Sequence, residues 1–351
     1  MTRSRLLLVI ILILAAIFLA TQFGRLEDYV HILSVGEPTW IGFALIGLGI
    51  WQVVQAAQFQ AAHRAAAVEQ GLLPLLPVVA ANNFILIALP TGSLGTVALF
   101  LANARRHGLS PERVAVAVAF FAIFQYLSLI TAIAVALVAL AAHGALYPLE
   151  WLPALPVFAL GLGQYAVLAL ALRWPAGLER ASAWLALRVN RLSQRLLRRD
   201  LVSVERMDEI GARAADGLNS MRQKGPRVQL ALLFYGLAGQ VLLGAVLALT
   251  LRAFSQPVSP TIVLSGLGMA GLFTVVSPTP LGVGIVEGGL AAVFASLGVE
   301  PGAALIVSLA FRGLTLWLPV LYGFVALQTL GFEAIRPSKD ERRRTMDGLQ
   351  S

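Results

Sequence analysis

Two ionisable side chains lie deep inside otherwise uncharged stretches of this sequence. Glu287 lies eleven residues before Gly298, and Arg312 lies eleven residues after Pro301. If both segments are helices, each charge lies about 16 Å from the same end, near the middle of a hydrocarbon layer about 30 Å thick. An ionised group at that depth costs about 2.5–3.5 kcal/mol, and a helix N-terminus returns only about 0.3–1 kcal/mol to a carboxylate. We therefore expect the two side chains to pair or to line a water-filled cavity.

This pair has two compatible interpretations. It can be a static ion pair that pins one helix to another. It can also be a polar site in which Arg312 receives an anionic head group and Glu287 is the counter-ion or a proton acceptor.

Two adjacent amides lie at a comparable depth from the other face. Asn82 and Asn83 follow Gly71 by eleven and twelve residues. Amides at that depth either join helices by hydrogen bonds or contact a substrate; Gln52 on an earlier span carries a weaker signal of the same kind. The candidate binding residues are Arg312, Glu287, Asn82, Asn83, Pro278, Pro280, Gly282 and Gly284.

The composition limits the class of protein that can hold these residues. The chain has 351 residues, of which 58% are hydrophobic and 13% charged, with a mean hydropathy of +0.81. A soluble fold of this size needs more polar residues to cover its surface. The absence of cysteine also excludes a disulfide framework and a cysteine nucleophile.

Uncharged segments of membrane-spanning length follow one another along the chain. The first is expected to be a retained signal-anchor rather than a cleaved signal peptide. Six segments read as full spans: 6–23, 40–60, 114–142, 151–172, 228–251 and 302–330.

Two further uncharged segments are interrupted by breakers. Residues 70–104 contain Pro90-Thr91-Gly92, and residues 253–286 contain Pro278-Thr279-Pro280. A single helix does not run through such breaks. We therefore predict an all-α polytopic membrane protein with six full spans and two helical hairpins. The expected hairpin arms are 72–89 with 93–104, and 260–277 with 282–297.

The basic residues are distributed unequally between the two sides. With the N-terminus inside, 23 of the 26 Lys and Arg residues fall on the inner side, two on the outer side, and Arg312 within a span. Such a bias predicts a multi-pass protein of the cytoplasmic (inner) membrane with both termini in the cytoplasm. It leaves nucleic-acid binding without support despite the net charge of +8.

The two halves of the chain share an order of features. Each has a span, a broken hairpin, a turn ending in proline and another span, and Pro111 to Phe121 has the same length as Pro301 to Phe311. The predicted hairpins enter from opposite sides, which is the inverted-repeat plan of many secondary transporters. The alternative is that proline and glycine only mark turns between unrelated helices.

The transmembrane domain is expected to cover 1–332, with a basic cytoplasmic insert at 173–227. Within the insert, 176–199 reads as an amphipathic helix on anionic lipid or as a plain basic loop with helical content, and 211–225 as a second helix or a linker. Residues 333–351 are expected to be a disordered basic cytoplasmic tail.

Enzyme motifs are missing from the sequence. There is no P-loop, no GxSxG and no HExxH, and the four histidines have no metal-ligand spacing. We therefore expect no catalysis, no cofactor and no metal.

The breaker motifs resemble those of the lysylphosphatidylglycerol synthase transmembrane-region family, also called flippase-like integral membrane proteins. The resemblance covers about 5–330, and where family members often show an acidic residue after the first-hairpin glycine, this chain has Thr96. In the multiple peptide resistance factors this domain is associated with moving an aminoacylated lipid between leaflets, ahead of a soluble aminoacyl-transferase domain that we do not expect here. The resemblance rests on Asn82-Asn83, Leu89-Pro90, Gly92, Leu94-Gly95, 104–110, 277–287 and 310–312.

The leading hypothesis is a lipid flippase for an anionic or lipid-linked phosphate head group, with membrane lipids as its partners. The alternative is a non-catalytic scaffold, a partner subunit of a lipid-modifying or glycosyl-transferring enzyme. A weaker third hypothesis is an intramembrane lipid enzyme, for which only Glu287 is a candidate acid or base.

Overall fold

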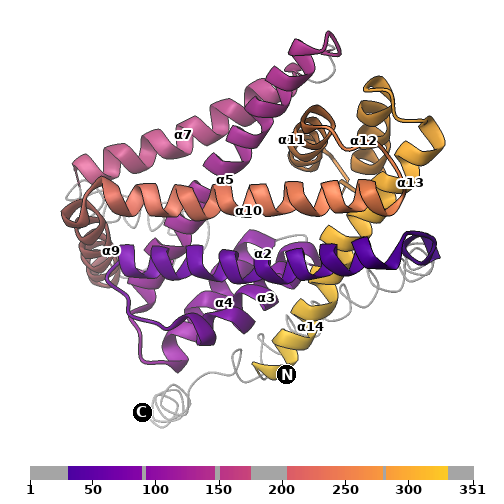
Figure 1. Ribbon diagram of the computed structural model, residues 1–351. Coiled ribbons are helices and arrows are strands. Elements are labelled where there is room, and N and C mark those ends of the chain that lie inside the picture. The colour runs from indigo at the N-terminus through magenta and orange to yellow at the C-terminus, as the bar shows by residue number, and fades with distance from the viewer. Residues whose placement is uncertain (1–30, 89–91, 147–150, 175–203, 280–281, 331–351) are drawn as a thin grey trace, which may run out of the picture.

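The computed structural model describes residues 31–88, 92–146, 151–174, 204–279 and 282–330, and every regular element within these ranges is a helix (Figure 1). Five helices in them are long and apolar enough to cross a membrane. This confirms the predicted all-α polytopic membrane fold, while the expected span 6–23 lies outside the described residues. The five are α2 (Pro38–Ala65), α5 (Pro111–Ala142), α7 (Ala154–Arg173), α10 (Pro226–Ala253) and the helix Pro301–Thr329.

Helices α2 and α10 lie side by side and antiparallel (Figure 1). At one end the Glu37 N–H donates to the Ala253 carbonyl at 2.8 Å. Toward the other end Gln58 Nε2 donates to the Leu232 carbonyl at 3.1 Å. The pair therefore defines the two ends of the bundle.

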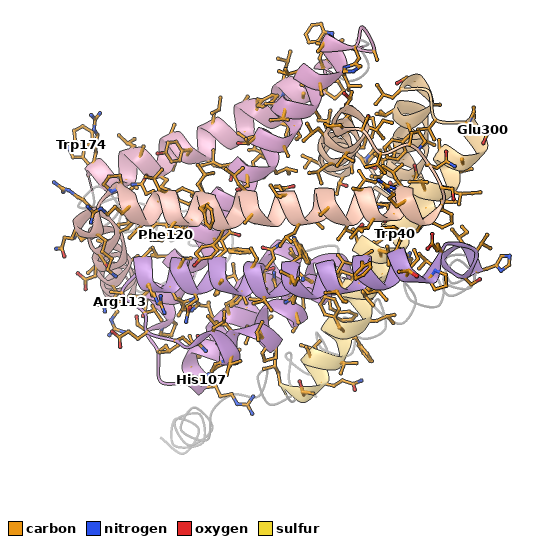
Figure 2. All side chains as sticks on the ribbon, in the orientation of Figure 1. Trp40, His107, Arg113, Phe120, Trp174 and Glu300 are labelled. Carbon is orange, nitrogen blue, oxygen red and sulfur yellow. The ribbon has the colours of Figure 1, made fainter. Side chains whose placement is uncertain are left out.

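The two ends of the bundle differ in charge. Figure 2 shows Arg113 and His107 at one end and Trp40 and Glu300 at the other. We call the first the basic end, because it gathers Arg64, Arg105, Arg106, Arg113, Arg222, Lys224 and Arg227. We call the other the opposite end.

Both predicted hairpins are present and enter from different ends. The first consists of α3 (Leu72–Ala88) and α4 (Gly92–Arg106), which start and finish at the basic end. The second consists of α11 (Pro260–Val276) and α12 (Ile285–Ser296). It starts at the opposite end, where the Thr261 hydroxyl meets His143 Nε2 at 3.1 Å at the end of α5.

Each hairpin packs its first arm on the long helix that follows the other hairpin. Helix α3 packs on α14 (Leu318–Thr329), and α11 packs on α5. Both contacts need glycine, because a Cβ at Gly323 would lie 2.5 Å from the Ala80 carbonyl oxygen and a Cβ at Gly268 would lie 2.5 Å from the Ala132 carbonyl oxygen. The hairpins thereby join the two halves of the chain; that the halves are a repeat stays a prediction.

The last span is not the single uninterrupted helix that the sequence suggested. It consists of α13 (Pro301–Arg312), a π-helical segment η2 (Gly313–Trp317) and α14. Pro319 in the first turn of α14 has no N–H to donate, and the Thr315 hydroxyl donates to the Phe311 carbonyl at 2.8 Å. A π turn inside an α-helix often lies at a functional site, and here it starts directly after Arg312.

A polar helix covers the basic end of α5. Helix α9 (Val204–Lys224) is held there by Arg113–Asp216 at 3.3 Å and Arg213–Glu112 at 3.4 Å. The segment 211–225 is therefore helical rather than a linker. The expected amphipathic helix 176–199 and the tail 333–351 lie outside the described residues.

In the described residues, the two larger hydrophobic core clusters each surround one hairpin. One cluster surrounds α3 and α4, where the Phe59 and Phe100 rings stack with centroids 4.0 Å apart. The other surrounds α11 and α12 and includes Met269, Leu290 and Phe294, which are fully buried. Each hairpin is thus fixed by its own packing.

Candidate functional site

The connection between α11 and α12 satisfies many of its own polar groups. The Thr279 N–H donates to Ser277 Oγ at 3.2 Å, and the Thr279 hydroxyl donates to the Val283 carbonyl at 3.1 Å. Gly282 and Gly284 have φ of +72° and +87°. That left-handed region favours glycine, so the two glycines allow the chain to turn back within the span. Pro278 is exposed on this connection, and Pro280 lies outside the described residues.

Glu287 caps the helix that this connection starts. It is the third residue of α12, and its Oε2 accepts the Gly284 N–H at 2.6 Å. The first turn of a helix leaves N–H groups without intrahelical acceptors, and its dipole favours a negative charge there. Glu287 therefore fixes the start of α12 inside the bundle.

The same carboxylate pairs with Arg312. Arg312 Nε donates to Glu287 Oε1 at 3.3 Å, and the two side chains are only 9% and 5% exposed. The predicted pairing of these residues is confirmed. Breaking such a buried pair by removing one partner costs about 3–5 kcal/mol, because the other charge stays buried without compensation.

The π-helical segment lies against the connection that carries Glu287. Its buried residues Leu316 and Trp317 pack with Val283 and Leu309. Arg312 is therefore held between a capped helix on one side and a π turn on the other. We call Glu287 and Arg312 the charged pair.

The predicted amides belong to a different cluster. Asn82 is 2% exposed, and its Oδ1 accepts the Thr96 hydroxyl at 2.6 Å. Asn83 Nδ2 donates to Gln52 Oε1 at 3.0 Å, and the Tyr322 hydroxyl donates to the same oxygen at 3.0 Å. We call Gln52, Asn82, Asn83, Thr96 and Tyr322 the amide cluster.

Three members of the amide cluster were not among the candidate binding residues: Gln52, Thr96 and Tyr322. Gln52 gave a weak signal as a glutamine in an apolar span, and Tyr322 gave none, because a tyrosine ring suits any apolar helix. Their importance depends on which helices touch, since Gln52 and Tyr322 are 270 residues apart in the sequence.

The candidate residues thus fall into two places rather than one. Gly282 and Gly284 lie beside the charged pair, whereas Asn82 and Asn83 lie in the amide cluster. Tyr322 follows Arg312 by ten residues on the last span, which is about 15 Å along a helix. The two clusters therefore lie on either side of η2.

A groove of about 520 Å³ opens between α5, α10 and α11, away from the candidate residues. Its lining is apolar apart from Thr131 and Gln240. In the part of the chain that the structure describes, no group of three His, Asp or Glu side chains could hold a metal ion.

Five long apolar helices and two broken hairpins that enter from opposite ends define a polytopic membrane protein with a charged pair inside it. Residues 6–323 match the family model of the lysylphosphatidylglycerol synthase TM region, so the chain belongs to this family. The resemblance drawn from the breaker motifs is therefore confirmed. No curated protein and no solved structure matches the chain.

Proposed function

We propose that this protein moves lipids with an anionic head group between the two leaflets of a membrane. The observation that carries the proposal is the buried contact between Arg312, in the interior of the last apolar helix, and Glu287, at the start of the second arm of a broken hairpin. Membership of a family named for a lysylphosphatidylglycerol synthase supports a lipid-related role.

In this proposal Arg312 is the phosphate-binding group. A guanidinium presents several donors in a fixed plane and matches phosphate oxygens better than an ammonium does. A head group that reaches Arg312 competes with Glu287 for it. Glu287 then retains its hydrogen bond from the Gly284 N–H, which keeps the carboxylate partly compensated while the phosphate is bound.

The proposal places the basic end in the cytoplasm of a cell with an inner membrane. An excess of Lys and Arg in short loops favours the cytoplasmic side. It assigns no catalysis, cofactor or metal to this chain, and leaves the acyl chains in the bilayer while the head group crosses.

Reconstituted vesicles containing labelled phosphatidylglycerol test this proposal. Arg312→Ala should abolish head-group transfer, and Arg312→Lys should restore part of it by keeping the charge. Arg252→Ala is the matched control, because Arg252 is an exposed arginine at the opposite end and its loss changes the net charge equally. Normal transfer by Arg312→Ala would remove this residue from the mechanism.

The scaffold hypothesis predicts a different result. If purified wild-type protein transfers no lipid but retains an enzyme through α9, it is a partner subunit. The exposed ion pairs of α9 make that helix the surface to delete in a pull-down experiment.

A further inference from the structure

The side chain of Gln52 is held in one orientation by two donors. Its Oε1 accepts Asn83 Nδ2 from α3 and the Tyr322 hydroxyl from α14, each at 3.0 Å. An amide oxygen has two lone pairs, so both are used. The amide nitrogen must then point away from these two partners.

That nitrogen is buried and unused. Gln52 Nε2 has no hydrogen-bond partner among the residues that the structure describes. Buried amide donors in folded proteins nearly always have an acceptor, and leaving one empty costs stability. An empty donor held in place by two other hydrogen bonds is what a binding site for an acceptor oxygen requires.

In the described part of the chain, the three helices that orient this donor carry no charged side chain beside it. Helices α3 and α14 contain no charged residue, and on α2 the basic side chains are confined to its last turn. A phosphate would find no compensating charge here, whereas a hydroxyl or an ester oxygen would need none. The cluster therefore fits a neutral oxygen.

We propose that Gln52, oriented by Asn83 and Tyr322, binds the uncharged hydroxyl-bearing part of a lipid head group. This inference rests on the proposed function and adds a specificity to it. Arg312 binds the phosphate. The hydroxyl-bearing part binds at Gln52, beside Tyr322, which lies about 15 Å further along the last span on the other side of η2. A head group that crosses meets the two sites in turn.

Two labelled lipids with the same acyl chains separate these roles. Phosphatidylglycerol carries glycerol hydroxyls beyond its phosphate, and phosphatidic acid carries none. In vesicles with the full chain, wild-type protein should transfer phosphatidylglycerol faster. Gln52→Met should slow phosphatidylglycerol about five- to tenfold and leave phosphatidic acid within about twofold, which is the size of one lost hydrogen bond. Tyr322→Phe should act in the same direction with a smaller effect.

The matched control is Gln55→Met, which removes a buried glutamine three residues further along α2. An equal slowing of both lipids by Gln52→Met, no slowing, or the same change in Gln55→Met would overturn the inference. So would a wild-type protein with no preference between the two lipids.

A binding measurement keeps this inference separate from the transport proposal. Purified full chain is exposed to an equimolar mixture of the two lipids, and the retained lipids are quantified by mass spectrometry. Wild-type protein should retain more phosphatidylglycerol, and Gln52→Met should lose that excess. Equal retention by both proteins refutes the site even where transfer occurs, whereas a retained excess without transfer refutes only transport.

Discussion

The two hairpins share an outline but hold different polar chemistry. The second presents a carboxylate to a guanidinium, Glu287 to Arg312, with both side chains buried. The first presents amides to a hydroxyl and to another amide, Asn82 to Thr96 and Asn83 to Gln52. The charged pair is buried, whereas in the amide cluster only Asn82 is buried and the other members are half-buried, so the two sets differ in charge and in burial.

Under the proposed function, the two clusters serve two different parts of a lipid head group. Its phosphate needs a positive charge within the bilayer. An arginine buried there needs a carboxylate that compensates its charge. Its hydroxyls need only oriented donors and acceptors. The Thr96 hydroxyl adds no charge to the amide cluster, so under the proposed function the anion falls to Arg312.

The largest expected effect comes from breaking the charged pair. Arg312→Ala should lower the free energy of unfolding by about 3–5 kcal/mol, because Glu287 loses its cation while buried. Replacing both residues by leucine should recover much of that loss without recovering transfer. Thermal unfolding in detergent measures both variants. If Arg312→Ala is as stable as wild type, water reaches the charged pair and its charges are not buried.

Alanine at the glycines of the connection should have the next largest effect. Gly282→Ala adds a Cβ 2.4 Å from Val286 Cγ2 at a φ of +72°, whereas at Gly284, with φ of +87°, the Cβ meets nothing within 4 Å. We expect about 1–2 kcal/mol of backbone strain at each, and about 1–3 kcal/mol more from overpacking at Gly282. Equal losses of the two variants in thermal unfolding would show that the contact with Val286 adds no cost.

Breaking the amide cluster should cost less than breaking the charged pair. Thr96→Val removes the donor to Asn82 Oδ1 and should cost about 1–3 kcal/mol, the range for a buried polar group left unsatisfied. Thr131→Val is the control, because the Thr131 hydroxyl is exposed and donates to the Leu127 carbonyl of its own helix. If Thr96→Val lowers the free energy of unfolding as much as Arg312→Ala does, the two clusters contribute equally to stability and the expected difference between them is wrong.

The smallest effect concerns an exposed carboxylate, Glu300, which is the N-cap residue of α13. Hydrogen bonds from the backbone N–H groups of Gly302 and Ala303 lower the pKa of Glu300. Because the pKa is lower in the folded state, its stabilising effect is complete above the ordinary value of 4.5 and is lost as the pH falls through the lowered pKa. Glu300→Gln should slightly lower the unfolding temperature at neutral pH, where the carboxylate is charged, and should remove the fall of the unfolding temperature in that acidic range. A large change at neutral pH would show that Glu300 does more than cap α13.

The sequence was sufficient for the spans within the described residues, for the hairpins and for the charged pair. Hydrocarbon forces every backbone group to be satisfied within helices, so apolar length and breakers predict the elements directly. The pairing of Glu287 with Arg312 could be predicted because two opposite charges lay at equal depth and an unpaired charge there is costly.

Contacts between helices could not be predicted in this way. Asn82 and Asn83 are adjacent in sequence, but successive residues point about 100° apart on a helix, so one meets α4 and the other meets α2. The π turn after Arg312 also gave no sequence signal, because it depends on how the last span packs against the connection at Val283.

The sequence by itself determined that this chain folds as apolar helices with two breaks and one buried pair of charges, since composition and depth decide what a bilayer tolerates. Only the tertiary structure decided that Gln52, Asn83 and Tyr322 share one amide oxygen and leave one donor empty. Hydrogen bonds are short-ranged and directional, so their partners are set by helix packing and not by the order of residues along the chain.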